Sequence, residues 1–414
     1  MNNNDIVTNN ISKKRFNNGK LNIGTYYLAP YARTEKHIKD AAACGIDFFV
    51  NVPIDAFLLD LLRNENIGAI VTGVFPSWFG GDGSNAGQMA EKNPLSAYEN
   101  AIANFIDAPN IYGIDTGDEP SLLDFPHYGE IFSRVNTALP HLTPYLNIYP
   151  SYAVKGSNTA EEIRTQLGTH SYAQYIDTYC QNVASDYICF DYYPYSASLE
   201  GLYESLVTVS NACKKYNRKM FMVLQVNSHE PDVWLSANKL RFQAFHAMAF
   251  GTQTIIWACY TAGWWYNHVL DKEGNKTEQY EKLKKVNSEI HFLGIEYMNY
   301  NYEETHFVGN HFVSTVTSKD VLSTSFVSQF KAEHNEALVV STMHSTKGKA
   351  LFICAAGDFY DNNNESFTIT FRSNQSNVIL LKNETRTTLI PNSEGIYTFS
   401  ISTNEGALLA IETL

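Results

Sequence analysis

Two adjacent carboxylic acids, Asp118 and Glu119, stand between an apolar run and a proline in the stretch YGIDTGDEPS. Ionising both side chains is unfavourable, so like-charge repulsion raises the pKa of one of them. A carboxylic acid that keeps its proton near neutral pH is suited to protonating a leaving oxygen. Glycosidic cleavage needs such a donor and a second group that stabilises or attacks the sugar carbon. We therefore predict that Glu119 is a general acid/base and that Asp118 assists it.

A structural role for the pair is the simpler alternative. Either acid can cap the helix that follows, with Pro120 in the first turn of that helix. Two acids are more than one cap requires, and the proline stiffens the turn that carries them. The pattern therefore favours catalysis over capping.

Asp191 is the second candidate catalytic acid. It lies in YICFDYYPY, at the end of another apolar run, where a buried aspartate bonded to the backbone is an equally good interpretation. Glu230 lies in a loop after the run KMFMVLQV, and a solvated loop acid is the simpler interpretation of it.

Aromatic and amide side chains occur at the ends of the same apolar runs. A pyranose face packs on a flat ring, and its hydroxyls bond to amides and to the polar edges of Tyr and Trp. Trp257, inside IIWACY, fits a core as well as a sugar platform, whereas the adjacent pair in GWWYN favours a wall of a binding site. The side chains that we expect to bind substrate are Tyr26, Trp78, Asn147, Tyr193, Gln225, Trp257, Trp264 and Trp265.

The elements that must position these residues are eight apolar runs separated by amphipathic segments. The runs are continuous rather than alternating, which is typical of parallel strands buried on both faces. Gly45 and Gly251 follow helical stretches, as glycines after helix ends do. The runs are LNIGTYYL, GIDFFVNV, IGAIVTGVF, NIYGIDTG, TPYLNIYP, YICFDYYPY, KMFMVLQV and TQTIIWACY.

Eight strand–helix units over about 275 residues match a (β/α)₈ TIM barrel in the α/β class. An open doubly wound sheet is the rival fold, but its first turn is rich in glycine, and YYLAPYAR is not. Barrels carry their catalytic groups at the carboxyl ends of the strands. We therefore expect the acids, amides and aromatic residues to converge on one face.

The chain changes character near Asn299, where short strands rich in Val, Ile, Thr and Phe alternate with Asn, Gly and Ser clusters. This spacing predicts an antiparallel β-sandwich. The expected organisation is a polar N-terminal extension over 1–20, the catalytic barrel over 21–298 and the sandwich over 299–414.

Composition excludes several classes of function. The net charge of −13 argues against a nucleic-acid partner, and no apolar stretch approaches the length of a membrane span. Residues 1–20 lack an apolar signal core, so the protein is either cytoplasmic or exported with its signal peptide removed. Of these we expect a secreted or periplasmic protein, with a carbohydrate as its partner.

Neither metal nor cofactor chemistry is indicated. Six cysteines are scattered without CxxC or metal-ligand spacing, and His170, His229 and His268 form no HExxH or paired motif. No G-x-S-x-G elbow is present, which argues against an α/β-hydrolase esterase. We expect no cofactor, no metal and no disulfide framework.

Several motifs together resemble the clan A glycoside hydrolases. These are the acid and proline that end the fourth run, the sixth run FDYYPY, and the small-residue helix that leads into AFGTQTIIWACY. The chain is most similar to barrel glycosidases of gut bacteria, whose fourth strand ends in a similar GDEP stretch. Its end, EGALLAIETL, resembles the C-terminal sandwiches appended to such barrels.

The resemblance implies that Glu119 is the acid/base and that a Glu at the end of strand seven is the nucleophile. This chain departs there, because Gln225 stands in that position and cannot form a glycosyl ester. A second resemblance, to hexosaminidases that use the N-acetyl group of the substrate, needs no protein nucleophile. It implies that Asp118 orients the acetamide, that Glu119 is the acid, and that Tyr192 or Tyr193 steadies the intermediate. A carbohydrate-binding protein on a degenerate barrel is the non-enzymatic alternative.

Overall fold

The computed structural model describes residues 14–80, 85–154, 159–311, 313, 316–346, 348–357, 359–360, 365–375 and 377–412. Eight parallel strands close into a barrel in which β1 pairs with both β2 and β8. The predicted (β/α)₈ barrel is confirmed, with a strand in each of the eight apolar runs. The strands are β1 (Asn22–Tyr26), β2 (Phe48–Pro53), β3 (Gly68–Thr72), β4 (Ile111–Asp118), β5 (Thr143–Ile148), β6 (Tyr187–Tyr192), β7 (Lys219–Gln225) and β8 (Thr252–Ala258).

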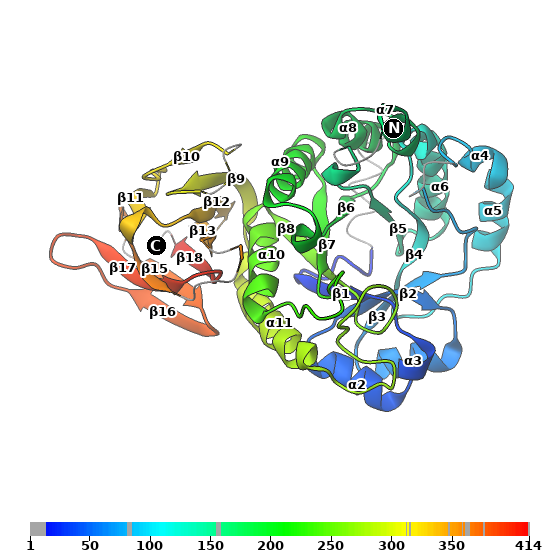
Figure 1. Ribbon diagram of the computed structural model, residues 1–414, viewed down its shortest axis with the longest axis horizontal. Coiled ribbons are helices and arrows are strands. Elements are labelled where there is room, and N and C mark those ends of the chain that lie inside the picture. The colour runs from blue at the N-terminus through cyan, green and yellow to red at the C-terminus, as the bar shows by residue number, and fades with distance from the viewer. Residues whose placement is uncertain are drawn as a thin grey trace.

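Helices surround the barrel as an outer ring (Figure 1). Gly45 and Gly251 have φ values of +79° and +88°, so these glycines end α2 and α10 in the left-handed conformation that the sequence indicates. The helices are α2 (Glu35–Ala43), α3 (Ala56–Asn64), α4 (Met89–Lys92), α5 (Leu95–Ala103), α6 (Phe125–Ala138), α7 (Ala160–Gln166), α8 (Tyr172–Asn182), α9 (Leu199–Tyr216), α10 (Ala237–Ala249) and α11 (Glu278–Tyr297). Short 3₁₀ turns follow several strands: η1 (Pro30–Ala32), η2 (Leu122–Asp124), η3 (Ser151–Ala153) and η4 (Pro194–Ser196).

Successive side chains of each strand face opposite sides. On β6, Tyr187 and Cys189 belong to the cluster inside the barrel, whereas Ile188 and Phe190 pack into the layer between strands and helices. Both faces are therefore buried, which explains the continuous apolar runs. By the same alternation Asp191 faces inward at the carboxyl end of β6.

Phe16 closes the amino-terminal end of the barrel interior. Its ring makes edge contacts with Phe48 and Tyr112 and lies 5.1 Å from the ring of Phe221. Lys14 donates to Asn136 and to the carbonyl of Leu142. The described part of the predicted polar extension, residues 14–20, therefore belongs to the barrel, because an apolar ring is needed to fill that end.

Replacing Phe16 with alanine is expected to lower the free energy of unfolding by about 3–5 kcal/mol, because a large cavity opens inside the barrel. Phe16 is 6% exposed, whereas Phe57 on α3 is 67% exposed, so F57A is the matched control and should change stability by less than about 0.5 kcal/mol. Urea unfolding of the two variants checks the prediction. Equal stability of F16A and F57A would show that the ring does not fill the barrel.

The C-terminal region forms the expected β-sandwich of two sheets. One sheet has seven strands in the order β10-β9-β12-β13-β18-β15-β16, and the other has three in the order β11-β14-β17. The pairing is antiparallel except that the two-residue β10 runs parallel to β9. The strands are β9 (Asn301–Val308), β10 (Ser318–Lys319), β11 (Val327–Ala332), β12 (Leu338–Ser345), β13 (Gly348–Ala355), β14 (Ser366–Ser373), β15 (Asn377–Lys382), β16 (Thr385–Leu389), β17 (Tyr397–Ser402) and β18 (Gly406–Glu412), with η5 (Glu333–Asn335) between β11 and β12.

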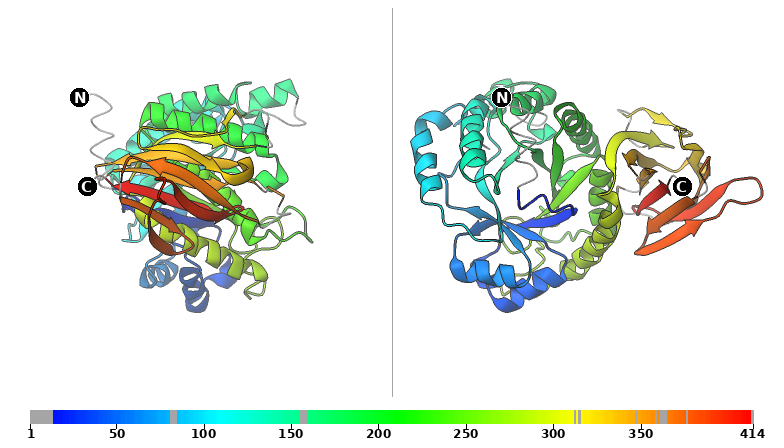
Figure 2. Two further views of the ribbon diagram at one scale, coloured as in Figure 1. Left: turned by 90° about the vertical axis from the view of Figure 1, so that its left-hand side faces the viewer. Right: turned by 180° about the vertical axis from the view of Figure 1, so that it is seen from behind.

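The seven-stranded sheet is buried on both faces. On β13, Leu351 and Ile353 point into the core between the two sheets, whereas Phe352 and Cys354 pack into the core of the barrel's helical layer. The sheet lies against α10 and α11 (Figure 1), and its strands stand in front of the barrel in the left-hand view of Figure 2. The two parts of the chain therefore share a continuous apolar core.

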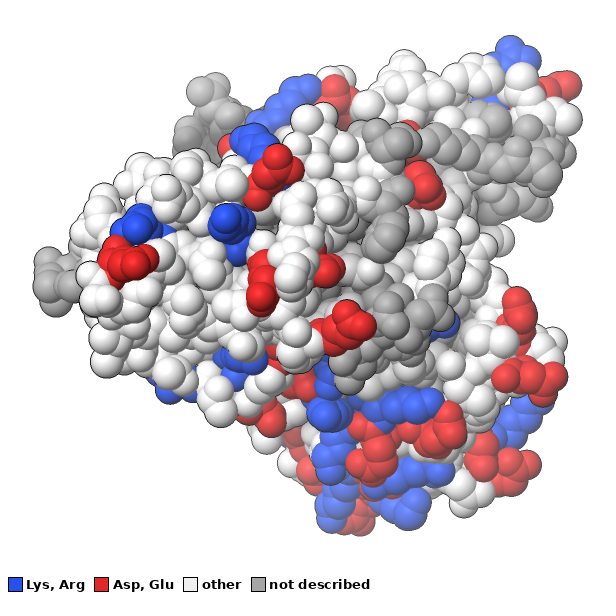
Figure 3. Space-filling model, turned by 60° about the vertical axis from the view of Figure 1, so that its left-hand side comes forward, with Lys and Arg blue, Asp and Glu red and all other residues white. Residues whose placement is uncertain are grey.

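The surface shows mixed charge. On the face in Figure 3, basic and acidic residues gather together toward the bottom, and most of the remaining surface is uncharged. Ion pairs on α2 and α11, such as Lys39–Glu35 and Lys282–Glu278, bring the two signs together. None of the helices described here is both long and apolar enough to cross a membrane.

Candidate active site

Glu119 lies directly after β4, at the carboxyl end of the barrel. Its φ of +45° is in the left-handed region, which is strained for a side chain other than glycine and is enriched at functional sites. Its backbone N–H donates to the carbonyl of Asn147 on β5 at 2.9 Å. The loop after β3 packs closely on it, since a Cβ at Gly80 would lie 2.0 Å from the carbonyl oxygen of Glu119.

The capping alternative is excluded by the hydrogen bonds of the next turn. Ser121 caps η2 by accepting from Leu123, and the carboxylate of Asp124 accepts from the backbone of Gly87 and Met89. Asp118 and Glu119 cap neither η2 nor α6. Glu119 is half-buried, and among the described residues its carboxyl makes no ion pair or hydrogen bond.

Asp118 and Asp191 are joined by one amide group. The Nδ2 atom of Asn147 donates to Oδ1 of Asp118 at 3.1 Å and to Oδ1 of Asp191 at 2.9 Å. The hydroxyl of Tyr152, on η3, donates to the other oxygen of Asp191 at 2.9 Å. Strands β4, β5 and β6 therefore bring two of the three predicted catalytic acids together, with Glu119 next to them.

The pKa shifts of these carboxyls assign Glu119 as the proton donor and Asp191 as the anion. Burial raises the pKa of Glu119 well above its usual value, and the carboxylates of Asp191 and Asp118 raise it further. Burial also raises the pKa of Asp191, to about 6, although hydrogen bonds from Asn147 and Tyr152 oppose the rise. The raised pKa favours the protonated form of Glu119, whereas Asp191 is mostly ionised near neutral pH, an arrangement that suits an acid and an anionic partner.

Asp118 shares this environment. Burial raises the pKa of its carboxyl to about 7, the charge of Asp191 raises it too, and the hydrogen bond from Asn147 opposes the rise. Asp115, three residues earlier on β4, has a pKa raised by burial to about 6. Four carboxyls thus lie at the carboxyl end of β4 and β6.

Replacing Asp118 with asparagine is expected to stabilise the protein at alkaline pH. The pKa of Asp118 is higher in the folded state, about 7, than the unperturbed 3.8, so between these values the folded chain holds a proton that the unfolded chain has released. Stability is therefore lost as pH rises through that window, and D118N removes the loss. We expect a gain of about 1–3 kcal/mol at pH 8 and none below pH about 4.

Urea unfolding at a series of pH values checks this prediction. The control is D232N, because Asp232 is exposed in the loop after β7 and its replacement should leave the pH dependence unchanged. A D118N variant that is less stable than the unaltered chain at pH 8 would contradict the prediction.

Tyr152 and Asp115 are site residues that the sequence analysis did not find. Tyr152 follows the strand end NIYP. Barrel enzymes carry their site residues in the loops after the strands, which identifies this loop as a candidate but does not single out Tyr152 within it. Asp115 carries a clearer signal, since it is an acid within an apolar strand. The register of β4 against β5 is irregular between Asp115, which pairs with Tyr145, and Asp118, which pairs with Asn147, so simple alternation does not relate the two acids.

Aromatic residues form one side of the mouth. Trp265 meets Tyr193 edge-on at 4.6 Å and packs 4.2 Å from the ring of His229. Trp264 is 37% exposed and contacts the rings of Tyr26 and Trp265. The GWWYN loop thus lies at the mouth with Tyr193, where a wall of a sugar site is expected.

Two of the predicted tryptophans lie elsewhere. Trp257 is 0% exposed and donates from its indole to Asn287 on α11, and Trp78 is 6% exposed within the same helical-layer core. The expectation that these two bind substrate is wrong, because Trp257 points from β8 into the helical layer and Trp78, in the loop after β3, is buried in that same layer. Trp78 contributes only its backbone carbonyl, which accepts from the N–H of Asp118.

Several polar candidates are already engaged within the protein. The hydroxyl of Tyr26 shares a 2.7 Å hydrogen bond with that of Tyr145, and the amide of Asn147 is used by the two aspartates. Asn147 therefore positions two carboxyls, whereas the hydroxyl of Tyr26 is engaged with another tyrosine. Of the two tyrosines considered for the intermediate, Tyr192 donates to the carbonyl of Ser198 and faces the helices, so Tyr193 alone faces the mouth.

The end of β7 carries no acid at the barrel axis. Gln225 is 1% exposed. Its Nε2 atom donates to Ser196 at 3.1 Å, and its backbone N–H donates to the side-chain oxygen of Gln243. Glu230 is exposed in the following loop, and its backbone N–H donates to the hydroxyl of Ser228. Within the described part of the chain, no three His, Cys, Asp or Glu side chains are arranged to hold a metal ion.

No protein-family model matches the chain, and no curated protein matches its sequence. A solved structure described as a glycoside hydrolase matches with a TM-score of 0.53 at 8% identity, over 95% of this chain and 92% of that one. A glucosidase from Croceicoccus marinus matches with a TM-score of 0.44 at 8% identity, over 94% and 95%. Native xylanase 10B from Thermotoga maritima matches with a TM-score of 0.43 at 10% identity, over 67% and 97%. The first of these likenesses confirms that the fold, barrel and sandwich together, resembles that of a glycoside hydrolase.

Proposed function

We propose that this protein is a glycoside hydrolase that cleaves a polysaccharide or glycan, with Glu119 as the proton donor. The observation that carries the proposal is the state of that side chain. Its carboxyl is half-buried beside Asp118 and Asp191, has no partner among the described residues, and stands on a strained backbone at the end of β4. A structural acid would be paired, whereas burial and two neighbouring carboxylates favour the protonated form of this one.

The reaction follows from the two protonation states. Glu119 donates its proton to the glycosidic oxygen as the bond to the sugar carbon breaks, so the leaving group departs as an alcohol. The developing positive charge on the sugar carbon is stabilised by the ionised Asp191, which Asn147 and Tyr152 hold in place. If Asp191 bonds to the sugar carbon, the deprotonated Glu119 then acts as the base that activates the water which hydrolyses this intermediate. If Asp191 instead activates a water, that water attacks the sugar carbon directly.

A substrate-assisted reaction is the second candidate, and Gln225 favours it. The position at the end of β7 holds an amide, so no protein nucleophile stands there. In that reaction Asp118 orients the acetamide of an N-acetylhexosamine, Glu119 remains the acid, and Tyr193 lies where it can contact the intermediate. This candidate restricts the substrate to N-acetylated sugars.

A panel of aryl glycosides and neutral oligosaccharides tests the proposal. Release of reducing sugar or aryl alcohol by the unaltered chain, and its loss in E119Q, is the expected result. Activity confined to N-acetylhexosaminides would select the substrate-assisted reaction. Binding of oligosaccharides without any turnover would replace the hydrolase with a carbohydrate-binding protein.

A further inference from the structure

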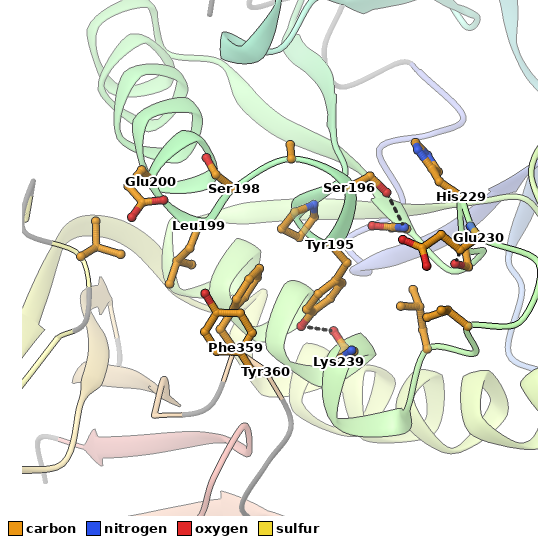
Figure 4. A pocket seen from close by; sticks show the side chains of 17 residues that line it. Tyr195, Ser196, Ser198, Leu199, Glu200, His229, Glu230, Lys239, Phe359 and Tyr360 are labelled. Atoms are coloured by element: carbon orange, nitrogen blue, oxygen red, sulfur yellow. Dashed lines mark hydrogen bonds between the residues drawn. The ribbon is translucent and has the colours of Figure 1, made fainter. Parts of the chain in front are cut away.

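A cavity of about 630 Å³ lies between the barrel and the β-sandwich. Its walls come from the segment after β6, from the loop after β7, from α10, and from Val313, Phe359 and Tyr360 of the C-terminal region. Figure 4 shows Phe359 and Tyr360 beside Tyr195, and Ser196 close to His229 and Glu230. Neither Asp118, Glu119 nor Asp191 lines it, so it is distinct from the catalytic carboxyls.

Gln225 points to a ligand for this cavity. Its side chain is 1% exposed, and its Oε1 atom has no hydrogen-bond partner among the described residues, while Nε2 donates to Ser196. A buried acceptor without a donor destabilises the folded protein. A donor from a molecule in the cavity would remove that penalty.

Three serines offer the complementary donors. The Oγ atoms of Ser196, Ser198 and Ser228 each accept a hydrogen bond, from Gln225, Gly201 and Glu230 respectively. Each serine hydroxyl therefore keeps its own hydrogen for a ligand. With the acceptor of Gln225, the cavity presents the mixture of donors and acceptors that a ring of hydroxyl groups requires.

Apolar surface completes the match. The rings of Tyr195 and Phe359 are stacked at 4.9 Å with an angle of 14°, and Leu199, Leu235 and Val313 also line the cavity. A pyranose carries an apolar C–H face and a polar rim, so it can pack on such a surface while its hydroxyls bond elsewhere.

The charge of the lining limits the ligand. Glu200 and Glu230 are acidic, and Lys239, the one lysine among the described lining residues, has its ammonium 5.1 Å from the centre of the Tyr195 ring. An anionic sugar would be repelled by the two carboxylates, and the lysine that could offset them is engaged over the ring of Tyr195. The lining therefore favours a neutral sugar.

We infer that this cavity is a second subsite that holds a neutral pyranose unit of the same glycan whose bond Glu119 cleaves. This inference rests on the proposed function. His229 connects the two places, because it lines the cavity and packs on Trp265, which contacts Tyr193 at the mouth. The β-sandwich, through Phe359, thus contributes to recognition of the chain beyond the cleaved unit.

Binding of neutral gluco-, xylo- and manno-oligosaccharides of two to six units, measured by calorimetry in an E119Q background, tests the inference. The longer members are expected to bind about tenfold more tightly than the disaccharide, since each extra subsite adds its own contacts. Both Q225L and F359A should abolish this gain, and F359A should leave disaccharide affinity unchanged. I390A is the control, because Ile390 is 84% exposed and does not line the cavity.

Failure of the inference and failure of the proposed function give different results. Chain-length dependence that survives in both Q225L and F359A would overturn the subsite, as would the absence of binding by every oligosaccharide. In either case, turnover by the unaltered chain would still stand. A chain-length dependence that both variants remove, in a protein without turnover, would support the subsite and refute the hydrolase.

Discussion

Replacing Glu119 with glutamine is expected to lower kcat by about 10²–10⁴-fold, the range that general acid catalysis supplies. The amide keeps the shape of the side chain but has no proton to transfer to the leaving oxygen. The loss should be largest for oligosaccharides and for alkyl glycosides, whose leaving groups need protonation. It should be smallest for dinitrophenyl glycosides, whose leaving groups depart as stable anions.

The pH profile gives a second measure of the same residue. Activity should fall as pH rises through the raised pKa of Glu119, because the proton donor is lost. E119Q should show no such alkaline limb with a dinitrophenyl substrate. The control is E91Q, since Glu91 is exposed on α4, and its activity should equal that of the unaltered chain. Full activity of E119Q on an alkyl glycoside would remove Glu119 from the mechanism.

Replacing Asp191 with asparagine is expected to lower kcat by a similar factor of about 10²–10⁴. The carboxylate of Asp191 is 2% exposed and accepts hydrogen bonds from Asn147 and Tyr152. Because β7 ends in Gln225 rather than an acid, Asp191 is the carboxylate that we assign to stabilising the sugar carbon. Its loss removes the charge that stabilises the sugar carbon. It also lowers the pKa of Glu119, because one of the two repelling carboxylates is gone.

Two readouts separate this role from a structural one. The alkaline limb of the residual activity should move to lower pH in D191N, a shift that a merely loosened site would not produce. Comparison with D118N then distinguishes the two mechanisms. A larger loss in D191N supports Asp191 as the catalytic partner of Glu119, whereas a larger loss in D118N, on N-acetylhexosaminides, supports substrate assistance. Unaltered turnover in both variants would contradict either reaction.

Gln225 illustrates how a departure from a family pattern acquires meaning only in three dimensions. In the sequence it is an amide where the resemblance implies a nucleophile. In the structure its side chain lines a cavity that the barrel and the sandwich build together, its Nε2 donates to Ser196, and its Oε1 has no partner among the described residues. The position has therefore kept its inward orientation while its chemistry suits hydrogen bonding rather than nucleophilic attack.

The sequence by itself determined the barrel, because each strand is buried on both faces and so reads as an unbroken apolar run. It also determined where β4 ends and that Glu119 stands there, since an acid pair before a proline is a local pattern. The helix-ending glycines Gly45 and Gly251 were equally readable, because a left-handed φ is a property of one residue.

Only the tertiary structure decided which side chains meet. Asn147 joins Asp118 to Asp191 across three strands, and Tyr152 reaches Asp191 from a loop whose path no local pattern specifies. Trp257 and Trp265 are both tryptophans near the end of β8, yet one packs against α11 and the other against Tyr193 at the mouth. The reason is physical: apolar periodicity sets which residues are buried, whereas the partner of each polar group depends on backbone positions brought together from distant parts of the chain.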